Sequence, residues 1–219
     1  MLAERLDHYA NRPDVLVLGL PRGGVPVAFE VAQALHAPLD VYVVRKIGVP
    51  GHEELAMGAQ ASGNVRVVNE EVVRQLNIPP DLFGRVAEIE RRELDRRENA
   101  YRGGRPPIQA RNRIVILVDD GIATGSTMKA AITALRKLKP AEIIAASPTI
   151  AATTFQQLRR EVAELVAVIV PDLFYAVGQW YENFSQTSDE EVRAFLLRAS
   201  DPDPRQKNQQ ASHDHLESR

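Results

Sequence analysis

Apolar segments that alternate with helical segments constrain the fold of this chain most strongly. Residues 15–20 (VLVLGL) and 113–121 (RIVILVDDG) are near-continuous apolar runs, typical of strands that are covered on both faces of a parallel sheet. Alternation at this spacing predicts an α/β fold with a doubly wound, mainly parallel sheet flanked by helices. The remaining expected strands are 39–47, 141–150 and 164–171, and residues 65–73 are expected to form a short strand and the start of a helix. The expected helices are 2–10, 25–36, 126–139 and 152–162.

Composition excludes several classes of function. The chain has 219 residues, a formal net charge of -2 and no cysteine. The charge provides no global basic field for nucleic acid, and the missing thiols exclude a disulfide framework, a thiolate metal site and a cysteine nucleophile. The first 14 residues carry charges where a signal peptide needs its apolar segment, and no apolar run is long enough to cross a membrane. We therefore expect a cytoplasmic protein that binds neither membranes nor nucleic acid.

The domain organisation is expected to be simple. Residues 1–198 are predicted to form one domain, in which residues 80–104 are a charged helical insertion and residues 172–198 contribute to a hood or to packing at the C-terminal end. Arginines and glutamates are interleaved in the insertion, which indicates a solvated helical face rather than an anion site. The loop at 102–113 is expected to be mobile. Residues 201–219 contain almost no apolar side chains and are predicted to be disordered.

One motif, ILVDDGIATGST at 116–127, contains most of the recognisable chemistry. The lysine of a Walker A loop is missing from it, and no G-x-G-x-x-G follows the first strand. Its backbone N–H groups from Ala123 to Thr127 would converge at a helix N-terminus, which favours a phosphate monoester. The glycines Gly121 and Gly125 would let the backbone approach the phosphate closely. The side chains of Thr124, Ser126 and Thr127 would add hydroxyl donors.

Two adjacent acids, Asp119 and Asp120, precede that loop. Carboxylate oxygens suit vicinal hydroxyls or a hydrated Mg²⁺. A ligand that satisfies both halves of the motif carries hydroxyls one sugar ring away from a phosphate. A ribose 5-phosphate has this arrangement, with the acids on the sugar and the amides on its phosphate.

The segment VILVDDGIATGST resembles the phosphoribosyl diphosphate signature of type I phosphoribosyltransferases. Over residues 1–198 the chain is similar to the bacterial group described as predicted phosphoribosyltransferases. The resemblance implies a fold with a small hood, and Mg²⁺-dependent transfer of a 5-phosphoribosyl group from phosphoribosyl diphosphate to a nitrogenous acceptor, with release of pyrophosphate. In that reading Asp119 and Asp120 are catalytic residues and metal ligands.

Further roles are implied by the same resemblance. In GLPRGGVP (19–26), Arg22, Gly23 and Gly24 would bind the pyrophosphate. VVRKIGVPGHEELAMGA (43–59) resembles the basic strand end and flexible loop of the family. Lys46 at the strand end would reach the pyrophosphate as a catalytic residue, and the loop up to Gly58 would close as a lid. His52 lies within this loop, and a lone loop histidine is more often solvated than catalytic.

The segment IVPDLFYAVGQWYENF (169–184) resembles the base-binding region of the purine members. There Phe174 would stack on the base and Glu182 would contribute to the metal site. A hydrophobic plug with Trp180 and Tyr181 in the core explains the same residues equally well. The hypoxanthine–guanine branch has an acid where this chain has Ala123, and a lysine that AASPTI lacks. The acceptor base is therefore not identified.

Two alternatives to the transferase remain open. A regulator could bind phosphoribosyl diphosphate or a nucleotide without catalysis, and a nucleotide phosphorolysis enzyme could share the 5-phosphate site. A Ser/His/Asp hydrolase is disfavoured because no G-x-S-x-G elbow occurs. The expected partners are phosphoribosyl diphosphate and a small nitrogenous base. A homodimer is compatible with the sequence, although no residue requires one.

Overall fold

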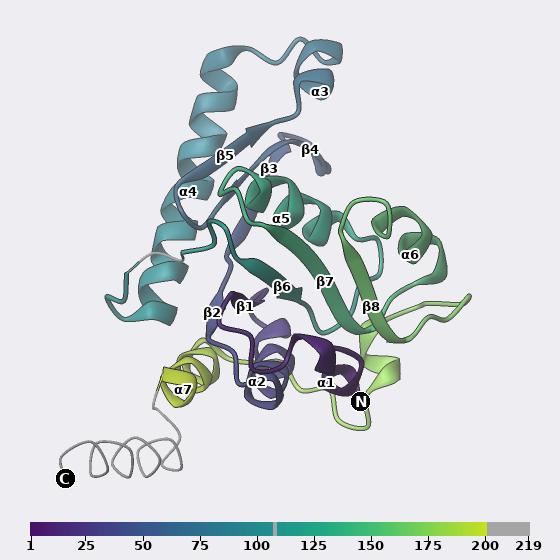
Figure 1. The fold of residues 1–219 in the computed structure, drawn as a ribbon. Coiled ribbons are helices and arrows are strands. Elements are labelled where there is room, and N and C mark those ends of the chain that lie inside the picture. The colour runs from purple at the N-terminus through teal and green to yellow at the C-terminus, as the bar shows by residue number, and fades with distance from the viewer. Residues whose placement is uncertain (107–108, 201–219) are drawn as a thin grey trace, which may run out of the picture.

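A five-stranded parallel sheet forms the centre of the protein, in the order β2-β1-β6-β7-β8 (Figure 1). The computed structural model describes residues 1–106 and 109–200, apart from the side chains of residues 53 and 54. The predicted tail at 201–219 and part of the predicted loop at 102–113 lie outside these residues. The strands are β1 (Val15–Gly19), β2 (Leu39–Val41), β6 (Ile114–Val118), β7 (Glu142–Thr149) and β8 (Glu164–Ile169).

Helices cover both faces of this sheet, as Figure 1 shows. Alternate residues of β6 enter different cores: Ile116 packs in the cluster beneath α1, α2 and α7, and Leu117 in the cluster beneath α5 and α6. Burial on both faces explains the continuous apolar runs, and the predicted fold class is confirmed. The helices are α1 (Leu2–Arg5), α2 (Gly24–Leu35), α5 (Ser126–Arg136), α6 (Ala152–Leu158) and α7 (Asp189–Ser200), with 3₁₀ turns η1 (Asp7–Tyr9) and η2 (Val177–Trp180).

A second, antiparallel sheet forms the small hood, in the order β3-β4-β5. Its strands are β3 (Val44–Val49), β4 (His52–Ala61) and β5 (Val65–Val68), and α3 (Glu70–Gln75) follows. The prediction of one strand over 39–47 is therefore wrong, and the segment predicted as a loop after it is the hairpin of β3 and β4. Its closure as a lid stays a prediction. The apolar run VYVV crosses from one sheet to the other, and Ser62 holds the junction by accepting from the Val43 N–H at 2.9 Å through its hydroxyl oxygen.

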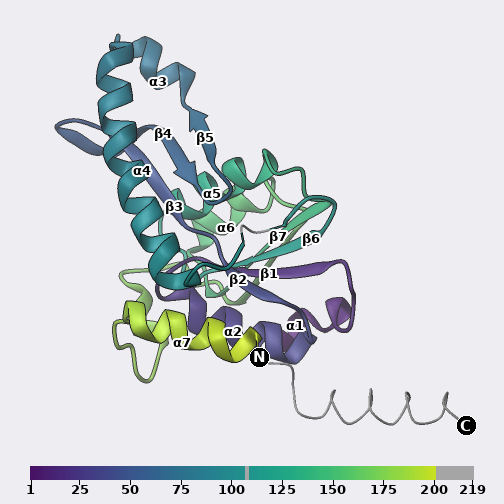
Figure 2. The same cartoon turned by 90° about the vertical axis from the view of Figure 1, so that its left-hand side faces the viewer.

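The long helix α4 (Pro80–Arg102) joins the hood to the main body. It runs along the small sheet and ends beside α7 (Figure 2). Ala87 packs in the core of the hood, whereas Leu94 and Tyr101 pack in the core of the central sheet. One helix therefore contributes to two cores.

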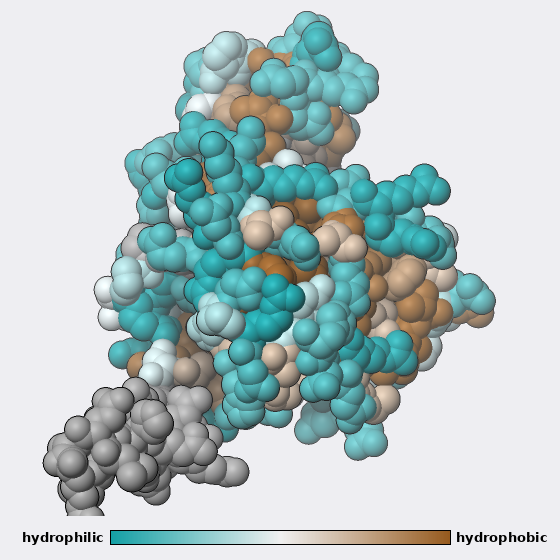
Figure 3. All heavy atoms as spheres, in the orientation of Figure 1, coloured by the Kyte–Doolittle hydropathy of each residue, from teal (hydrophilic) through white to brown (hydrophobic). Residues whose placement is uncertain are grey.

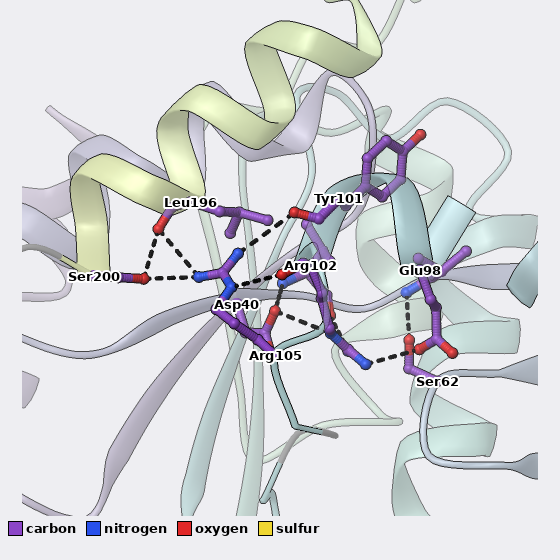
Figure 4. Close-up of polar contacts among 10 residues, drawn as sticks. Asp40, Ser62, Glu98, Tyr101, Arg102, Arg105, Leu196 and Ser200 are labelled. Atoms are coloured by element: carbon purple, nitrogen blue, oxygen red, sulfur yellow. Dashed lines mark hydrogen bonds and ion pairs between the residues drawn. The ribbon is translucent and has the colours of Figure 1, made fainter. Parts of the chain in front are cut away.

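A buried arginine fixes the end of α4 to the junction between the sheets (Figure 4). The Arg102 side chain is 6% exposed and forms ion pairs with Asp40 at 3.3 Å and with Glu98 at 3.0 Å. Its guanidinium also donates to the Val41 carbonyl at 3.0 Å. Burial raises the pKa of Asp40, and the nearby Arg102 opposes that rise. Arg102 thus satisfies a carboxylate and a carbonyl at the point where β2 ends.

The face seen in Figure 3 is mostly hydrophilic, with hydrophobic patches between charged side chains. Exposed apolar side chains include Ile89 on α4 and Leu76 after α3. Within residues 1–106 and 109–200, no helix is both long and apolar enough to traverse a lipid bilayer.

Candidate active site

The two acids lie at the carboxyl edge of the central sheet, directly after β6. Asp119 is fixed by the sheet, because its N–H donates to the Ala146 carbonyl at 3.1 Å. Its Oδ1 accepts from the Asp120 N–H at 3.0 Å. Tyr181 then donates its hydroxyl to the Asp120 carbonyl at 2.6 Å. The pair is held by backbone contacts, so both carboxylates keep acceptor positions for a ligand.

The loop after β1 packs directly on these acids. A Cβ on Gly23 would overlap the Oδ2 atom of Asp120, and one on Gly24 would lie 2.6 Å from the Val118 carbonyl oxygen. Neither position has room for a side chain, which explains the adjacent glycines. The preceding peptide, Pro21–Arg22, is cis. The structure thus brings together the predicted PRGG loop and the predicted acid pair.

The electrostatics of the acid pair oppose its ionisation. Burial, followed by the neighbouring charge of Asp120, raises the pKa of Asp119 well above its usual value. Burial also raises the pKa of Asp120. The Tyr181 hydroxyl has a raised pKa because it is buried and faces both acids. A cation, or hydroxyl groups that donate to the carboxylates, would stabilise the charged forms.

The predicted phosphate loop leads into α5. Gly125 has a φ of 73°, and a Cβ there would lie 2.7 Å from the Thr154 Cγ2. Thr154 also donates its hydroxyl to the Ala123 carbonyl at 2.5 Å, which anchors the loop to α6. The predicted contact residues Ala123, Thr124, Ser126 and Thr127 are exposed, and α5 begins at Ser126 without a side-chain cap. The Ser126 N–H donates to the Thr124 hydroxyl oxygen at 3.4 Å, and an anion bound at this helix N-terminus would replace that long contact.

A cavity of about 850 Å³ opens beside Asp120. Arg22, Gly23 and Asp120 line one wall, while Arg96 and Arg97 of α4 contribute to another. Polar side chains complete it on the segment before α7 and at the start of that helix: Asn183, Ser185, Gln186, Thr187 and Asp189. Asp120 lines the cavity and is followed along the chain by the 123–127 loop, so an extended ligand at Asp120 could contact both.

The other predicted residues do not line this cavity. Lys46 is half-buried on β3, opposite Ala59, and His52 is exposed at the start of β4. Phe174 is half-buried, with its ring centroid 6.4 Å from that of Trp180. None of these three is among the described residues that line the cavity. Gly121 is close to the C-terminal segment, because a Cβ on it would overlap the Val177 side chain.

The predicted metal ligands are not assembled as a group of three. Glu182 is exposed, and the part of the chain that the structure describes contains no cluster of three or more His, Asp or Glu side chains able to hold a metal. Asp119 and Asp120 remain suited to a hydrated divalent cation, since Mg²⁺ commonly takes one or two carboxylates and completes its shell with water and ligand oxygens.

Sequence reasoning missed four residues around the cavity: Arg96, Arg97, Tyr181 and Asp189. The charge pattern indicates a solvated helix face for the arginines, and the aromatic pattern allows a core position for Tyr181. Spacing alone could not identify them, because their position depends on the direction in which α4 leaves the hood. Tyr181 and Asp189 lie in segments whose path the sequence pattern does not define.

Comparison with known proteins gives a consistent result. A model of the phosphoribosyl transferase domain family matches residues 1–161. Two curated relatives from Mycobacterium tuberculosis strains CDC 1551 / Oshkosh and H37Rv, each named "Putative phosphoribosyl transferase", are 48% identical over 198 residues. The match covers 90% of this chain and 44% of each relative, so the chain spans less than half of their length.

A solved structure extends this likeness to three dimensions. The crystal structure of TT1426 from Thermus thermophilus is 39% identical, with a TM-score of 0.82 over 91% of this chain and 94% of that one. The family match therefore accompanies a shared fold over nearly the whole described chain. With the acid pair, the glycine loop and the hydroxyl-rich turn at one edge of a parallel sheet, the chain belongs to the phosphoribosyltransferase family, and its fold is of type I.

Proposed function

We propose that the protein transfers the 5-phosphoribosyl group of phosphoribosyl diphosphate to a nitrogenous acceptor and releases pyrophosphate. One observation carries the proposal: Asp120 lines a cavity with arginines in its wall, and the loop that follows the acid pair leads into an exposed helix N-terminus. A ribose with phosphate groups at both ends matches this order of chemical groups. The family membership supports the reaction class, and the acceptor is left unnamed.

Each part of the site has a separate role in the proposed reaction. The N–H groups and hydroxyls of the loop from Ala123 to Thr127 bind the 5-phosphate. Asp119 and Asp120 accept hydrogen bonds from the ribose hydroxyls. Arg22, the backbone of Gly23 and Gly24, and Lys46 bind the pyrophosphate. Phe174 stacks on the acceptor. The protein thus acts mainly by holding two reactants in the orientation for attack.

The bond changes need no nucleophile from the protein. The bond between C1′ and the pyrophosphate oxygen breaks, and its electron pair leaves on pyrophosphate. A nitrogen of the acceptor forms the new bond to C1′ and afterwards loses its proton. Arginine side chains and backbone N–H groups aimed at the leaving oxygens stabilise the charge that develops there.

The acid pair would also hold Mg²⁺. Burial and mutual repulsion raise the pKa of Asp119, a condition that a divalent cation relieves. When bound, the cation would neutralise charge on the departing pyrophosphate. The exposed Glu182 is a weaker candidate ligand, because it is not part of the cavity wall.

Calorimetric titration with phosphoribosyl diphosphate, with and without Mg²⁺, tests the proposal. We expect tight binding that depends on the metal, followed by pyrophosphate release with one or more nitrogenous acceptors. Binding without release across a broad acceptor panel would favour the non-catalytic regulator. Binding of ribose 5-phosphate or a nucleotide in the absence of any phosphoribosyl diphosphate binding would contradict the transferase.

A further inference from the structure

An aspartate occupies the space between two of the cavity arginines. The Asp189 carboxylate lies 3.8 Å from Arg22 Nη1 and 3.8 Å from Arg96 Nη1. It also accepts a hydrogen bond of 3.0 Å from the Tyr101 hydroxyl. Arg22 comes from the loop after β1, Arg96 from α4 and Asp189 from the first turn of α7. The Asp189 carboxylate thus links three segments that are distant in sequence.

The geometry of these ion pairs leaves them open to competition. At 3.8 Å the contacts are longer than the roughly 2.7–2.9 Å typical of charge-assisted hydrogen bonds. The Arg96 side chain is 57% exposed and the Arg22 side chain 36% exposed, so solvent screens both pairs. A ligand anion with several oxygens can approach both guanidiniums more closely than the tethered carboxylate does.

A second arginine of α4 lies beside the first. Arg97 lines the same cavity, and both arginines bind Glu93, with Nε–oxygen distances of 2.8 Å for Arg96 and 2.7 Å for Arg97. These contacts lower the pKa of Glu93 to about 2, so it remains ionised and keeps the two guanidiniums together. The other acid on this side, Glu191, accepts from the Ser188 N–H at 2.7 Å within its own helix cap.

The C-terminal end of α4 is firmly attached to the rest of the protein, so the arginines that α4 contributes to the cavity wall have fixed positions. Arg102 is buried against Asp40 and Val41, and Arg105 donates to the Leu196 carbonyl at 3.2 Å and to the Ser200 hydroxyl at 2.7 Å (Figure 4). Tyr101 is 1% exposed and reaches Asp189 from the same turn. The helix is therefore fixed to both the central sheet and α7, and it holds Arg96 and Arg97 in the wall of the cavity that the PRGG loop also lines.

We propose that Arg96 and Arg97 bind the pyrophosphate end of the substrate, in the place that Asp189 occupies between Arg22 and Arg96. This inference rests on the proposed function and adds to it a binding wall contributed by the helical insertion. Asp189 acts as an internal competitor, which the substrate's anionic end displaces. The lining acids Asp120, Asp189 and Glu191 balance Arg22, Arg96 and Arg97 in charge. The displacement releases the Nη1 groups of Arg22 and Arg96 from Asp189 for the ligand.

The test compares three probes on the full chain in the presence of Mg²⁺: phosphoribosyl diphosphate, inorganic pyrophosphate and ribose 5-phosphate. Arg96→Gln and Arg97→Gln should each weaken binding of the first two by about tenfold, the scale of a lost charge-assisted hydrogen bond. Binding of ribose 5-phosphate should not change. The matched control is Arg92→Gln, because Arg92 lies on the same helix, is 78% exposed and forms its ion pair with Glu88, away from the cavity.

Asp189→Asn provides an independent test that a folding defect cannot imitate. The asparagine oxygen can still accept from Tyr101, but the negative charge between the arginines is gone. We expect phosphoribosyl diphosphate and pyrophosphate to bind roughly threefold to tenfold more tightly, because the competing state is weakened.

The outcomes separate the two proposals. If the native protein binds neither phosphoribosyl diphosphate nor pyrophosphate, the proposed function fails, and this inference with it. If the native protein binds both and the arginine variants bind them equally well, only the role of Arg96 and Arg97 is refuted. Equal weakening for all three probes, or weaker binding by Asp189→Asn, would likewise contradict the inference.

Discussion

Adjacent carboxyls in a partly buried site lower the stability of the fold that holds them. Burial raises the pKa of both Asp119 and Asp120 above that of an exposed aspartate. A carboxyl with a raised pKa in the folded state binds protons more tightly there than in the unfolded chain. The contribution of each acid to the unfolding free energy is therefore most favourable below its unfolded pKa. It declines as the pH rises through the window up to the folded pKa.

The first prediction follows from this sign. Asp119→Asn should raise the thermal midpoint at neutral pH and remove part of the fall in stability as pH increases above about 4, the ordinary range for an aspartate. Asparagine can still accept from the Asp120 N–H, so the loop is retained. The same variant should lose about 1–3 kcal/mol of affinity for phosphoribosyl diphosphate. Calorimetric scans at several pH values and a titration measure both effects.

An unchanged thermal midpoint across that pH range would mean that the Asp119 carboxylate costs the unliganded protein no stability. Unchanged affinity for phosphoribosyl diphosphate would contradict the role of Asp119 in binding the ribose.

The second prediction concerns the loop that packs on the acids. Gly23→Ala introduces a methyl group where Asp120 Oδ2 lies, so the carboxylate must move or the loop must shift. We expect ligand affinity to fall by at least about tenfold, because displacing a binding group by about 1 Å is costly. Gly84→Ala on α4 is the control, since nothing lies within 4 Å of its added Cβ. It should stabilise the helix by about 0.5–1 kcal/mol without altering binding.

Among the elements, α4 depends on a buried cation more than on its surface ion pairs. Arg102→Met would leave Asp40 and Glu98, 20% and 18% exposed, without their guanidinium. Breaking a buried pair from one side costs about 3–5 kcal/mol, and we expect a loss of this order in urea denaturation. Adding Asp40→Asn to the same chain should recover part of it. Arg92→Gln should leave the denaturation midpoint unchanged, and a similar midpoint for Arg102→Met would contradict the assigned role.

The elements differ in how clearly the sequence specifies them. Strands β1 and β6 were predictable because burial on both faces requires continuous apolar runs. The division of 39–47 between two sheets was not, because Tyr42 and Val43 are as buried between the strands as Val41 is within β2. The hairpin of β3 and β4 was also missed. Its turn contains Pro50 and Gly51, which are equally common in flexible loops.

Across the whole molecule, stability is expected to be uneven. The core of the hood consists of Ile47, Val49, Met57, Val72 and Ala87, whereas the two clusters around the central sheet are much larger. Regions with smaller cores open at lower free energy. We predict that amides of β4 and β5 exchange with solvent faster than those of β1 and β6, as hydrogen-exchange mass spectrometry can measure. Equal protection in both sheets would show that α4 makes the molecule one cooperative unit.

The candidate site was predictable where one segment contains it. The acids and the hydroxyl loop occupy consecutive positions, so a strand, a turn and a helix place them without tertiary information. The cavity is different, since its walls come from the loop after β1, from α4 and from the segment after η2. Arg96 and Asp189 are 93 positions apart in sequence, and only the packing of α4 on α7 brings them within 3.8 Å. Local sequence patterns contain no information about such a long-range contact.

The single tryptophan of this chain gives the site a built-in optical reporter. Trp180 is next to Tyr181, whose hydroxyl binds the Asp120 carbonyl, and the indole N–H is buried without a hydrogen-bond partner among the described residues. Its emission is sensitive to changes in local polarity and to the position of the nearby Phe174 ring. We expect a movement of the acid pair on ligand binding to reach the indole through Tyr181. Fluorescence of the unmodified protein should then follow occupancy of the site in real time, with no label and no coupled assay.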